Sequence, residues 1–539
     1  MTQQQNGDAT DKQAKQQSEH EDLVQKSMGD FGPWQVWICL FLSIVKIPVA
    51  WCQLGIVFLA APMHFQCATS ANATEYDASD STWNEACYTA DHQPCNRWLY
   101  DRSVFRETII SEWDLVCDRK QLANVAQMIL MIGILVGNLS FSIAADRFGR
   151  KSPVIFAGVM QMITGVATAM MPWLSAFFLF RFLQAVAVGG TMTVSFVLCM
   201  EFLGGKWRTI ISSLTHVPFN IGQMTMVVIA YYTRDWRLYQ LAVSLPCVLF
   251  IFYIWLIPES PRWLLAVGKN KQALEILEVA ARKNKNPLPS LPDLGNGKKK
   301  KESKDENNLE NKVGILDLVR TPNMRKRTFA VCFDWAACGL CFYGLTQYVS
   351  HVGGNIFLNV AISGSLVVPG MLLSIYCMES LGRRMTLAGG QSMSALACLL
   401  LMLCHNYESS DLAWSEVLFG SIGILGCGIS FPTLYLFTGE FYPTVIRNIG
   451  VGTGSLCARI GSMVAPFVAS LNTIHPLLPP LAFAAISLIG AAVGLCLPET
   501  HNCDLPQTIE EGENFGIKHK KELTNGTGNP AFTNDESVY

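Results

Sequence analysis

Long apolar stretches recur along the chain from Trp34 onward and are separated by polar or charged segments. About 20 apolar residues in an α-helix cross the hydrocarbon layer of a bilayer, which is roughly 30 Å thick. The pattern therefore predicts twelve transmembrane helices in two sets of six. They are expected at 34–62, 122–145, 152–172, 176–200, 209–231, 236–257, 328–349, 353–377, 385–404, 413–437, 448–471 and 478–497.

Composition agrees with an all-α membrane protein. Of the 539 residues, 50% are hydrophobic and only 15% are charged, so most of the surface cannot face water. The net charge of -2 gives no basis for nucleic-acid binding. No motif typical of a nucleotide-binding, zinc-protease or serine-hydrolase site occurs in a suitable sequence context. We expect no enzyme activity, no cofactor and no metal site.

Basic residues near the ends of the spans predict the orientation, because short loops rich in Lys and Arg stay in the cytosol. One side carries Arg147, Arg150, Lys151, Lys206, Arg208, the lysines near position 300, Arg383, Arg384 and Arg447. The opposite loops have no Lys or Arg at 173–175, 350–352, 405–412 and 472–477, although Arg234 lies in the loop near 232–235. Both termini are therefore expected in the cytosol.

The spans divide the chain into two six-helix halves. The predicted parts are a cytosolic tail at 1–33 without a cleavable signal peptide, a first half at 34–263, a cytosolic linker at 264–327, a second half at 328–498 and a cytosolic tail at 499–539. The linker contains four consecutive lysines at 298–301 followed by acidic residues, a pattern typical of a solvated segment.

The first long loop, 63–121, is extracellular in this topology. It contains four cysteines, Cys67, Cys87, Cys95 and Cys117, and the sequon Asn72-Ala73-Thr74. An oxidising compartment favours two disulfides and glycosylation of Asn72. Four cysteines allow three pairings, and the sequence does not choose among them.

The two halves contain matching charged motifs, and the distance in sequence between the two copies is nearly the same for each motif. Asp146 to Lys151 after the second span corresponds to Glu379 to Arg384 after the eighth, and Pro258-Glu259 corresponds to Pro498-Glu499. Carboxylates and arginines at such matched positions can pair while neighbouring helices are close, which predicts a gate with two discrete states. The candidate gate residues are Asp146, Arg150, Glu201, Arg208, Glu379, Arg383, Glu440 and Arg447. The alternative is that they only satisfy the positive-inside rule.

These motifs resemble a known family. The Asp-Arg-x-Gly-Arg-Lys loop at 146–151 is similar to the signature of the major facilitator superfamily, and the segment 258–264 resembles one shared by its sugar and organic-ion branches. Segments that resemble its organic cation, anion and zwitterion transporters lie at 112–117, 235–237, 440–444, 458–461 and 505–510. The chain departs from the pattern at Ser142, where glycine is usual, and in a first loop with fewer cysteines.

The resemblance implies a major facilitator fold with a central cavity between the halves. Aromatic residues match positions where relatives line the substrate, and aromatic faces suit varied organic ions. These candidates are Phe219, Trp335, Phe342, Tyr343, Phe431 and Tyr435. Ordinary helix packing is the alternative for each residue.

Charge inside the cavity is expected to decide the substrate class. Arg459 matches a position where anion- and carnitine-handling relatives have Arg and cation-selective relatives have Asp. Val367 stands where cation carriers have Glu, and Met371 where some anion carriers have Lys. Lys46 lies about 18 Å into the first span and is a further candidate for a carboxylate ligand. Asp334 and Arg181 are weaker candidates as ligands.

The sequence therefore favours an alternating-access transporter of small organic ions in the plasma membrane, with a preference for anions or zwitterions such as carnitine-like compounds. The alternatives are an organic cation transporter of the same family, a sugar transporter of the superfamily and a non-transporting receptor or scaffold. The partners expected are a small organic ion and the lipid bilayer, with an unknown coupling ion. Ser537-Val538-Tyr539 matches a PDZ-binding end only weakly.

Overall fold

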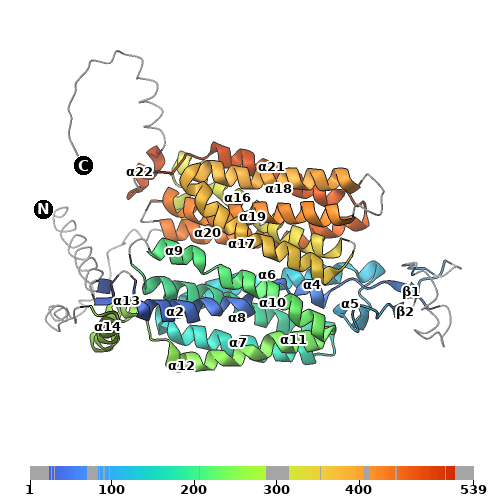
Figure 1. Ribbon diagram of the computed structural model, residues 1–539, viewed down its shortest axis with the longest axis horizontal. Helices are drawn as coiled ribbons and strands as arrows, with labels where there is room; N and C mark the ends of the chain where they lie inside the picture. The colour runs from blue at the N-terminus through green and yellow to red at the C-terminus, as the bar shows by residue number, and fades with distance from the viewer. Residues whose placement is uncertain are drawn as a thin grey trace, which may run out of the picture.

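Figure 1 shows the computed structural model as an elongated bundle of helices in two layers, with a small cap at one end. The structure describes residues 24–25, 27–29, 31–68, 83, 85, 87–88, 92–95, 97–204, 207–286, 315–352, 354–405, 413–443, 446–503 and 506–515. The end that carries the cap is called the disulfide end. The opposite end, which holds 146–151 and 379–384, is called the charged-loop end.

The first layer contains six crossings. They are α2 (Pro33–Ile44) with α3 (Lys46–Leu54) and α4 (Ile56–Leu59), α6 (Gln121–Phe148), α7 (Lys151–Met170), α8 (Leu174–Glu201), α9 (Trp207–Leu214) with α10 (Val217–Thr233), and α11 (Trp236–Ser244) with η3 (Leu245–Phe252) and α12 (Tyr253–Leu256).

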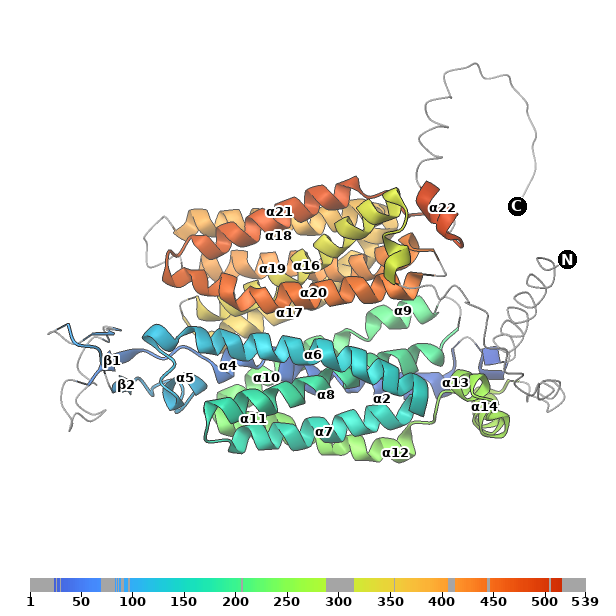
Figure 2. The ribbon, with the colours of Figure 1, turned by 180° about the vertical axis from the view of Figure 1, so that it is seen from behind.

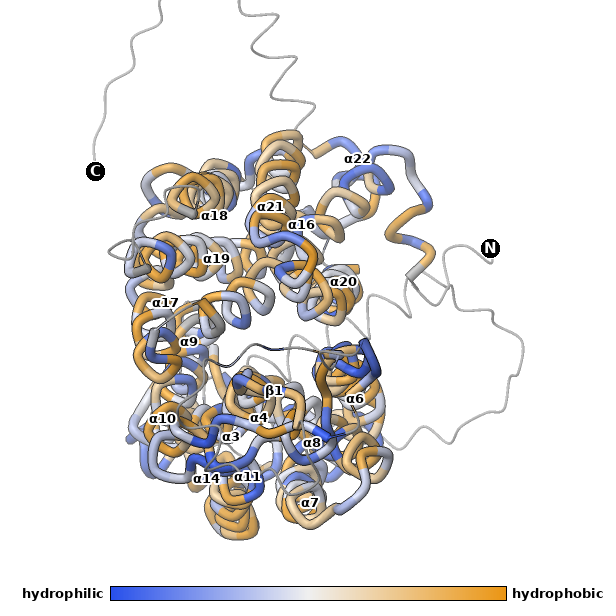
Figure 3. The backbone as a smooth tube through the Cα atoms, turned by 90° about the vertical axis from the view of Figure 1, so that its right-hand side faces the viewer, coloured by the Kyte–Doolittle hydropathy of each residue, from blue (hydrophilic) through white to orange (hydrophobic). Residues whose placement is uncertain are grey.

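The second layer also contains six crossings. They are α16 (Pro322–His351), α17 (Ile356–Ser380), α18 (Arg383–His405), α19 (Ala413–Phe441), α20 (Arg447–Ala469), which continues into η6 (Ser470–Thr473), and α21 (Leu478–Cys496). The reverse view in Figure 2 shows the same two layers, with α6 lying beside α20 where they meet. Seen along the bundle, α10 and α17 make the corresponding contact (Figure 3). The all-α fold of two six-helix halves is confirmed.

The bundle presents apolar side chains outward. Ile143, Trp255 and Tyr376 are each at least 70% exposed although they lie within predicted spans. Such a surface requires lipid around it, because soluble proteins rarely expose contiguous apolar belts. Within the described residues, eleven helices are individually long and apolar enough to cross a membrane. The twelfth crossing is α10, whose 17 residues fall just below that length and are extended by α9.

Several predicted spans are interrupted. The expected helix 209–231 is wrong as a single element, because it breaks between α9 and α10. Pro218 lies in the first turn of α10, and a proline has no N–H to continue the helical ladder from the preceding turn. The first span breaks at Val45, three residues before Pro48, for the same reason. Pro246 opens the 3₁₀ segment η3 in the sixth span.

The segment expected as a linker, 264–327, is more structured than predicted where it is described. Helices α13 (Pro261–Ala266) and α14 (Asn270–Asn284) cover the charged-loop end of the first half, and α16 already begins at Pro322. Leu277 and Ala280 of α14 are fully buried in the core of that half. Asn284 fixes the helix by accepting a hydrogen bond from the Trp34 backbone N–H at 3.1 Å. The run of lysines at 298–301 lies outside the described residues.

Part of the predicted tail 499–539 is also ordered. After the twelfth crossing, α22 (Ile509–Asn514) returns to the beginning of α16, near the 3₁₀ turn η4 (Ile315–Leu318). Glu513 accepts hydrogen bonds from the backbone N–H groups of Asn323 and Met324, both at 2.9 Å. A carboxylate at a helix N-terminus is stabilised by the unpaired N–H groups there.

The cap at the disulfide end contains strand β1 (Phe65–Cys67), paired antiparallel with β2 (Trp98–Tyr100), and the short turns α5 (Ile109–Glu112) and η2 (Cys117–Arg119). Glu112 fastens the cap to the bundle by pairing with Arg237 and accepting the Trp236 indole N–H at 2.7 Å. Two disulfides join Cys67 to Cys95 and Cys87 to Cys117, each with a Cα–Cα distance of 5.8 Å. Asn72 lies outside the described residues.

Disulfide mapping tests this connectivity. We expect non-reducing proteolysis and mass spectrometry to find peptides that join Cys67 to Cys95 and Cys87 to Cys117, because the Cα–Cα distance of each pair suits a disulfide. A serine at Cys67 is expected to free Cys95 for maleimide labelling while Cys87 and Cys117 stay blocked. A peptide linking Cys67 to Cys87 contradicts the arrangement.

Candidate functional site

A cavity of about 110 Å³ lies between the two halves. Its walls come from α3, α8 and α10 of the first half and from α16, α17, α19 and α20 of the second. The lining residues are Gln53, Met192, His216, Phe219, Asn220, Trp335, Phe342, Tyr343, Val367, Met371, Gly428, Phe431, Pro432, Tyr435, Ser455, Ala458, Arg459 and Ser462. The six aromatic candidates and Arg459 are therefore brought together, whereas Lys46 is not part of the wall.

The aromatic wall is built by helical spacing. Trp335 and Phe342 lie two turns apart on α16, and Phe431 and Tyr435 lie one turn apart on α19, so each helix presents one face. The Trp335 and Tyr435 rings are nearly perpendicular at 4.4 Å, and Phe342 meets Phe431 edge-on at 5.7 Å. The Trp335 indole N–H donates to Thr438 Oγ1 at 3.0 Å, which fixes the ring. The wall is rigid and largely apolar.

Arg459 supplies the charge of the cavity. The side chain lies on α20 and is only 7% exposed. Its Nη1 donates to the Tyr343 hydroxyl at 3.1 Å, and its Nη2 approaches Met192 Sδ at 3.6 Å. Its Nε has no hydrogen-bond partner, and no ion pair of Arg459 with a carboxylate occurs among the described residues. The guanidinium is thus a buried cation with neutral neighbours.

The two other basic candidates, Lys46 and Arg181, are buried and form hydrogen bonds with neighbouring spans. Lys46 is 3% exposed, donates to Thr215 Oγ1 at 2.9 Å and lies 5.2 Å from the Phe196 ring centroid. It fills the space where the first and fifth spans both break. Arg181 is 1% exposed and donates from Nε to the Ala126 carbonyl at 3.3 Å.

The cavity also contains polar residues that the sequence analysis did not predict. Gln53 accepts a hydrogen bond from the Tyr343 hydroxyl at 2.8 Å, which links α3 of the first half to α16 of the second. The His216 ring lies 5.9 Å from the Tyr435 ring, and Asn220 follows one turn later on α10. Polar side chains inside predicted spans are the signal that could have found them, since such groups are costly in a membrane.

The cavity is closed toward the disulfide end by aromatic contacts between the halves. Phe357 at the start of α17 stacks on Phe58 at 5.8 Å and also meets Phe105 and Tyr231 at 5.4 and 5.5 Å. Hydrogen bonds and ring contacts that cross between the halves in the described chain lie at the cavity or on this side of it. At the charged-loop end, the ion pairs instead join elements within one half.

At the charged-loop end of the first half, Arg150 joins the loop between α6 and α7 to the end of α8. Its Nη1 pairs with Asp146 at 2.5 Å and its Nε with Glu201 at 3.1 Å. Burial lowers the pKa of the Arg150 guanidinium, but hydrogen bonding to Asp146 and the charge of Glu201 hold that pKa above its ordinary value. Glu259 accepts the backbone N–H groups of Arg150 and Lys151 at 2.8 and 3.1 Å.

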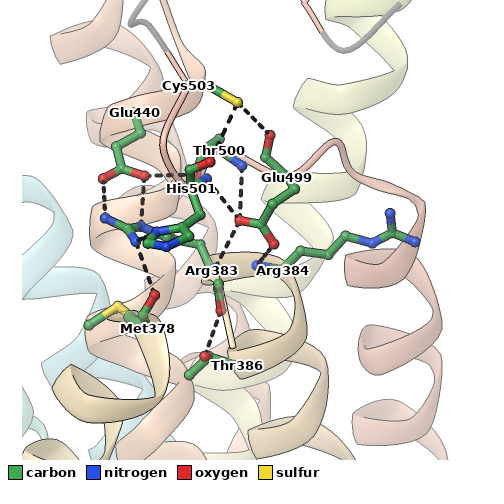
Figure 4. A network of polar contacts seen from close by, with 10 residues as sticks. Met378, Arg383, Arg384, Thr386, Glu440, Glu499, Thr500, His501 and Cys503 are labelled. Atoms are coloured by element: carbon green, nitrogen blue, oxygen red, sulfur yellow. Dashed lines mark hydrogen bonds and ion pairs between the residues drawn. The ribbon is translucent and has the colours of Figure 1, made fainter. Parts of the chain in front are cut away.

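The second half repeats this network (Figure 4). Arg383 donates hydrogen bonds from Nε and Nη2 to Glu440, both at 3.1 Å, and Thr500 donates to the same carboxylate at 2.7 Å. Glu499 accepts the backbone N–H groups of Arg383 and Arg384 at 2.9 and 3.1 Å, as Glu259 does in the first half. The sequence repeat is thus a repeat of structure.

Both loops need glycine at one position. Gly149 and Gly382 have φ angles of 96° and 86°, which side chains with a Cβ rarely adopt. A Cβ at these positions would also collide with Glu259 or Glu499. The glycines allow each carboxylate to reach the first N–H groups of the next helix.

The predicted gate residues do not all take part. Glu379 and Arg208 are exposed, and no bond joins them to another described residue in these networks. Asp146 pairs with Arg150 but remains 73% exposed. Arg447 donates to the Tyr442 carbonyl at 3.3 Å. The ion pairs join elements within one half, so they fasten each half internally rather than latch the two halves to each other.

Similar proteins support a transport function for this arrangement. A sequence profile of the sugar (and other) transporter family matches residues 64–510. The chain is 34% identical to the organic cation transporter protein of Drosophila melanogaster, with 92% of this chain and 95% of the relative covered. It is 32% identical to organic anion transporter 3 of Oryctolagus cuniculus, with 92% and 94% covered. The solved proton:xylose symporter XylE matches the fold with a TM-score of 0.60 at 16% identity, covering 88% of this chain and 98% of the symporter.

Twelve crossings in two halves around a central cavity define a membrane transporter of the major facilitator superfamily. The chain belongs to the sugar (and other) transporter family and, within it, to the organic cation and anion transporters. It is a multi-pass membrane transporter and not an enzyme, as the resemblance of its motifs implied.

Neutralising a carboxylate inside the network is expected to impair transport more than neutralising an exposed carboxylate on the nearby loop. We expect Glu440→Gln to lower the maximal uptake rate several-fold and to leave apparent affinity near the wild-type value, because Glu440 holds Arg383 outside the cavity. Loss of hydrogen bonds to a charged group costs about 1–3 kcal/mol. Uptake kinetics normalised to surface protein, and thermal unfolding in detergent, measure the two effects.

Glu379→Gln is the matched control, since Glu379 is exposed at the corresponding loop. It is expected to behave like the wild type in both measurements. Equal loss in the two variants contradicts the assignment of the network to Glu440, and a change confined to affinity contradicts its place outside the cavity.

Proposed function

We propose that the protein carries small organic anions or zwitterions across the membrane by alternating access, and that Arg459 binds the anionic group. The observation behind this proposal is the buried guanidinium of Arg459, whose hydrogen-bond partners are neutral. A buried charge is strongly disfavoured without a counter-charge. A substrate carboxylate supplies that counter-charge and fits the guanidinium fork with two charge-assisted hydrogen bonds.

The aromatic wall suits the rest of such a substrate. Trp335, Tyr435 and Phe431 offer flat apolar surface, and their ring faces attract a quaternary or primary ammonium group. A zwitterion such as a carnitine-like compound would use both features of one cavity. The described lining contains no Asp or Glu that would bind an ammonium group more strongly.

Alternating access follows from two rigid halves that meet around the cavity. The networks at Arg150 and Arg383 brace each half, and the contacts of Phe357 close the disulfide end. Separation of those aromatic contacts, with closure at the charged-loop end, would expose the cavity to the other side. The family relatives are carriers, so a receptor or scaffold role has less support.

An organic cation is the second candidate. Its support is the aromatic wall and the similarity of the chain to the organic cation transporter protein of Drosophila melanogaster. A radiolabel uptake panel of carnitine-like zwitterions, organic anions and quaternary amines, run with and without sodium and a pH gradient, separates the two. Uptake of amines alone contradicts the proposal.

The proposed location is the plasma membrane with both termini in the cytosol, from the distribution of Lys and Arg in the loops. The disulfide end would then be extracellular, and Asn72 would be glycosylated. A shift in gel mobility on glycosidase digestion that Asn72→Gln removes supports this orientation. The C-terminal residues Ser537 to Tyr539, a weak PDZ-binding match, lie outside the described residues.

Arg459 provides the sharpest test. We expect Arg459→Ala to weaken binding of a carboxylate-bearing substrate by about 2–5 kcal/mol, which corresponds to tens- to thousands-fold in affinity. Arg459→Lys is expected to keep part of the uptake, because lysine retains the charge and loses the fork. Arg459→Asp is expected to abolish anion and zwitterion uptake and to admit some cations.

The control is surface-biotinylated protein measured beside uptake, since loss of a buried side chain also affects folding. Lys46→Met serves as a matched variant, because Lys46 is a buried cation outside the cavity wall. It is expected to spare apparent affinity. An Arg459→Ala protein that reaches the surface and transports with unchanged affinity overturns the proposal.

A further inference from the structure

A buried carboxylate lies in the second half, away from the cavity. Asp334 is 0% exposed on α16 and faces α18 and α21, where Gly490 and Gly494 allow the helices to approach it. Neither of its carboxylate oxygens has a hydrogen-bond partner among the described residues. Its neighbour in sequence, Trp335, lies in the cavity wall.

Gln391 completes the cluster from α18. This side chain is 4% exposed and lies within hydrogen-bonding reach of Asp334. Its Nε2 donates to Cys338 Sγ at 3.7 Å, and its Oε1 also lacks a partner among the described residues. Gly490 is required opposite it, because a Cβ there would collide with Oε1. Three acceptor oxygens therefore lie close together, and none of them accepts a hydrogen bond from a described residue.

No positive charge is available to these oxygens in the described part of the chain. The titratable side chain that interacts with Asp334 is Cys338, which is on the same helix. The neighbours on α18 and α21 are Gln391 and the glycines at 490 and 494, which do not titrate. A buried anion in such surroundings neutralises by taking up a proton.

One proton resolves the excess of acceptors. A protonated carboxyl group gains an O–H donor, and Gln391 Oε1 is the unpartnered acceptor within reach. A hard metal cation would require six or more oxygen ligands, twice the number present. Inverting the Gln391 amide would offer a charged Asp334 a single neutral donor, which leaves its second oxygen unpaired.

We propose that Asp334 and Gln391 form a proton-binding site in the second half, and that the proton makes transport depend on pH. Loss of the proton leaves an unpaired charge between α16, α18 and α21, so the protonated form holds these helices together. Because α16 also carries Trp335 and Tyr343 in the cavity wall, proton occupancy biases the shape of the cavity. The proton is taken from and returned to water; no other reactant is needed.

The first test observes the proton directly and does not depend on transport. Infrared spectra of purified wild-type protein near neutral pH are expected to contain the carbonyl stretch of a protonated, buried carboxyl group, which shifts in deuterated water. The band is expected to vanish in Asp334→Asn. The matched control is Asp118→Asn, since Asp118 is exposed outside the bundle, and the band is expected to persist. A spectrum without the band in the wild type overturns the site.

The second test rests on the proposed function and measures uptake against pH on both sides of the membrane. The wild type is expected to vary with pH, whereas Asp334→Asn, which mimics the neutral carboxyl, is expected to transport with that dependence lost. Gln391→Leu removes the acceptor and is expected to shift the midpoint of the profile. An Asp334→Asn profile identical to the wild type, at normal surface amount, overturns the coupling. Failure of wild-type uptake itself counts against the transport proposal and leaves the spectroscopic result standing.

Discussion

The hydrogen bond from Arg459 to Tyr343 connects the central cavity to the contact between the halves. Tyr343 accepts from the guanidinium and donates to Gln53, so a chain of two hydrogen bonds runs from α20 through α16 to α3 of the first half. Arg459 also approaches Met192 on α8. A carboxylate that binds the guanidinium competes with these neutral partners. Under the proposed function, occupancy of the cavity would change the link between the halves and would couple binding to rearrangement without a separate sensor.

Such coupling requires that each half moves as a unit. Glu259 and Glu499 bind the first N–H groups of α7 and α18, and Arg150 and Arg383 tie the same loops to α8 and α19. These bonds close within a half, so they survive a rotation of one half against the other. The contacts expected to break are the aromatic ones of Phe357, which are apolar and carry no desolvation cost for charges. In the proposed mechanism, ion pairs would hold each half together as it moves, and the apolar contacts would be the ones that separate.

Periodicity predicts the crossings, and the resemblance of the motifs to a known family predicts the aromatic residues of the cavity wall and Arg459. They do not predict that Lys46 lies outside the wall, since this depends on the rotation of α3 and on the break at Thr215 that receives its ammonium group. Gln53 and His216 were missed because single polar residues in an apolar span carry no spacing pattern. The matched position of Glu379 suggested a partner, yet helix rotation leaves it exposed. The disulfide pairing depends on how the cap folds, which four cysteines alone do not reveal.

The cavity wall favours some classes of substrate over others, because each class would leave a different set of charges without a partner. An organic cation would find ring faces but would also meet the charge of Arg459, which has no carboxylate to neutralise it among the described residues. A purely apolar solute would leave the guanidinium desolvated with neutral partners. An anion would pair with it, and a zwitterion would pair with it while placing its ammonium group against the ring faces of Trp335 or Tyr435. Anions and zwitterions would therefore leave no charge without a partner in this cavity, whereas a cation or an apolar solute would leave the guanidinium unpaired.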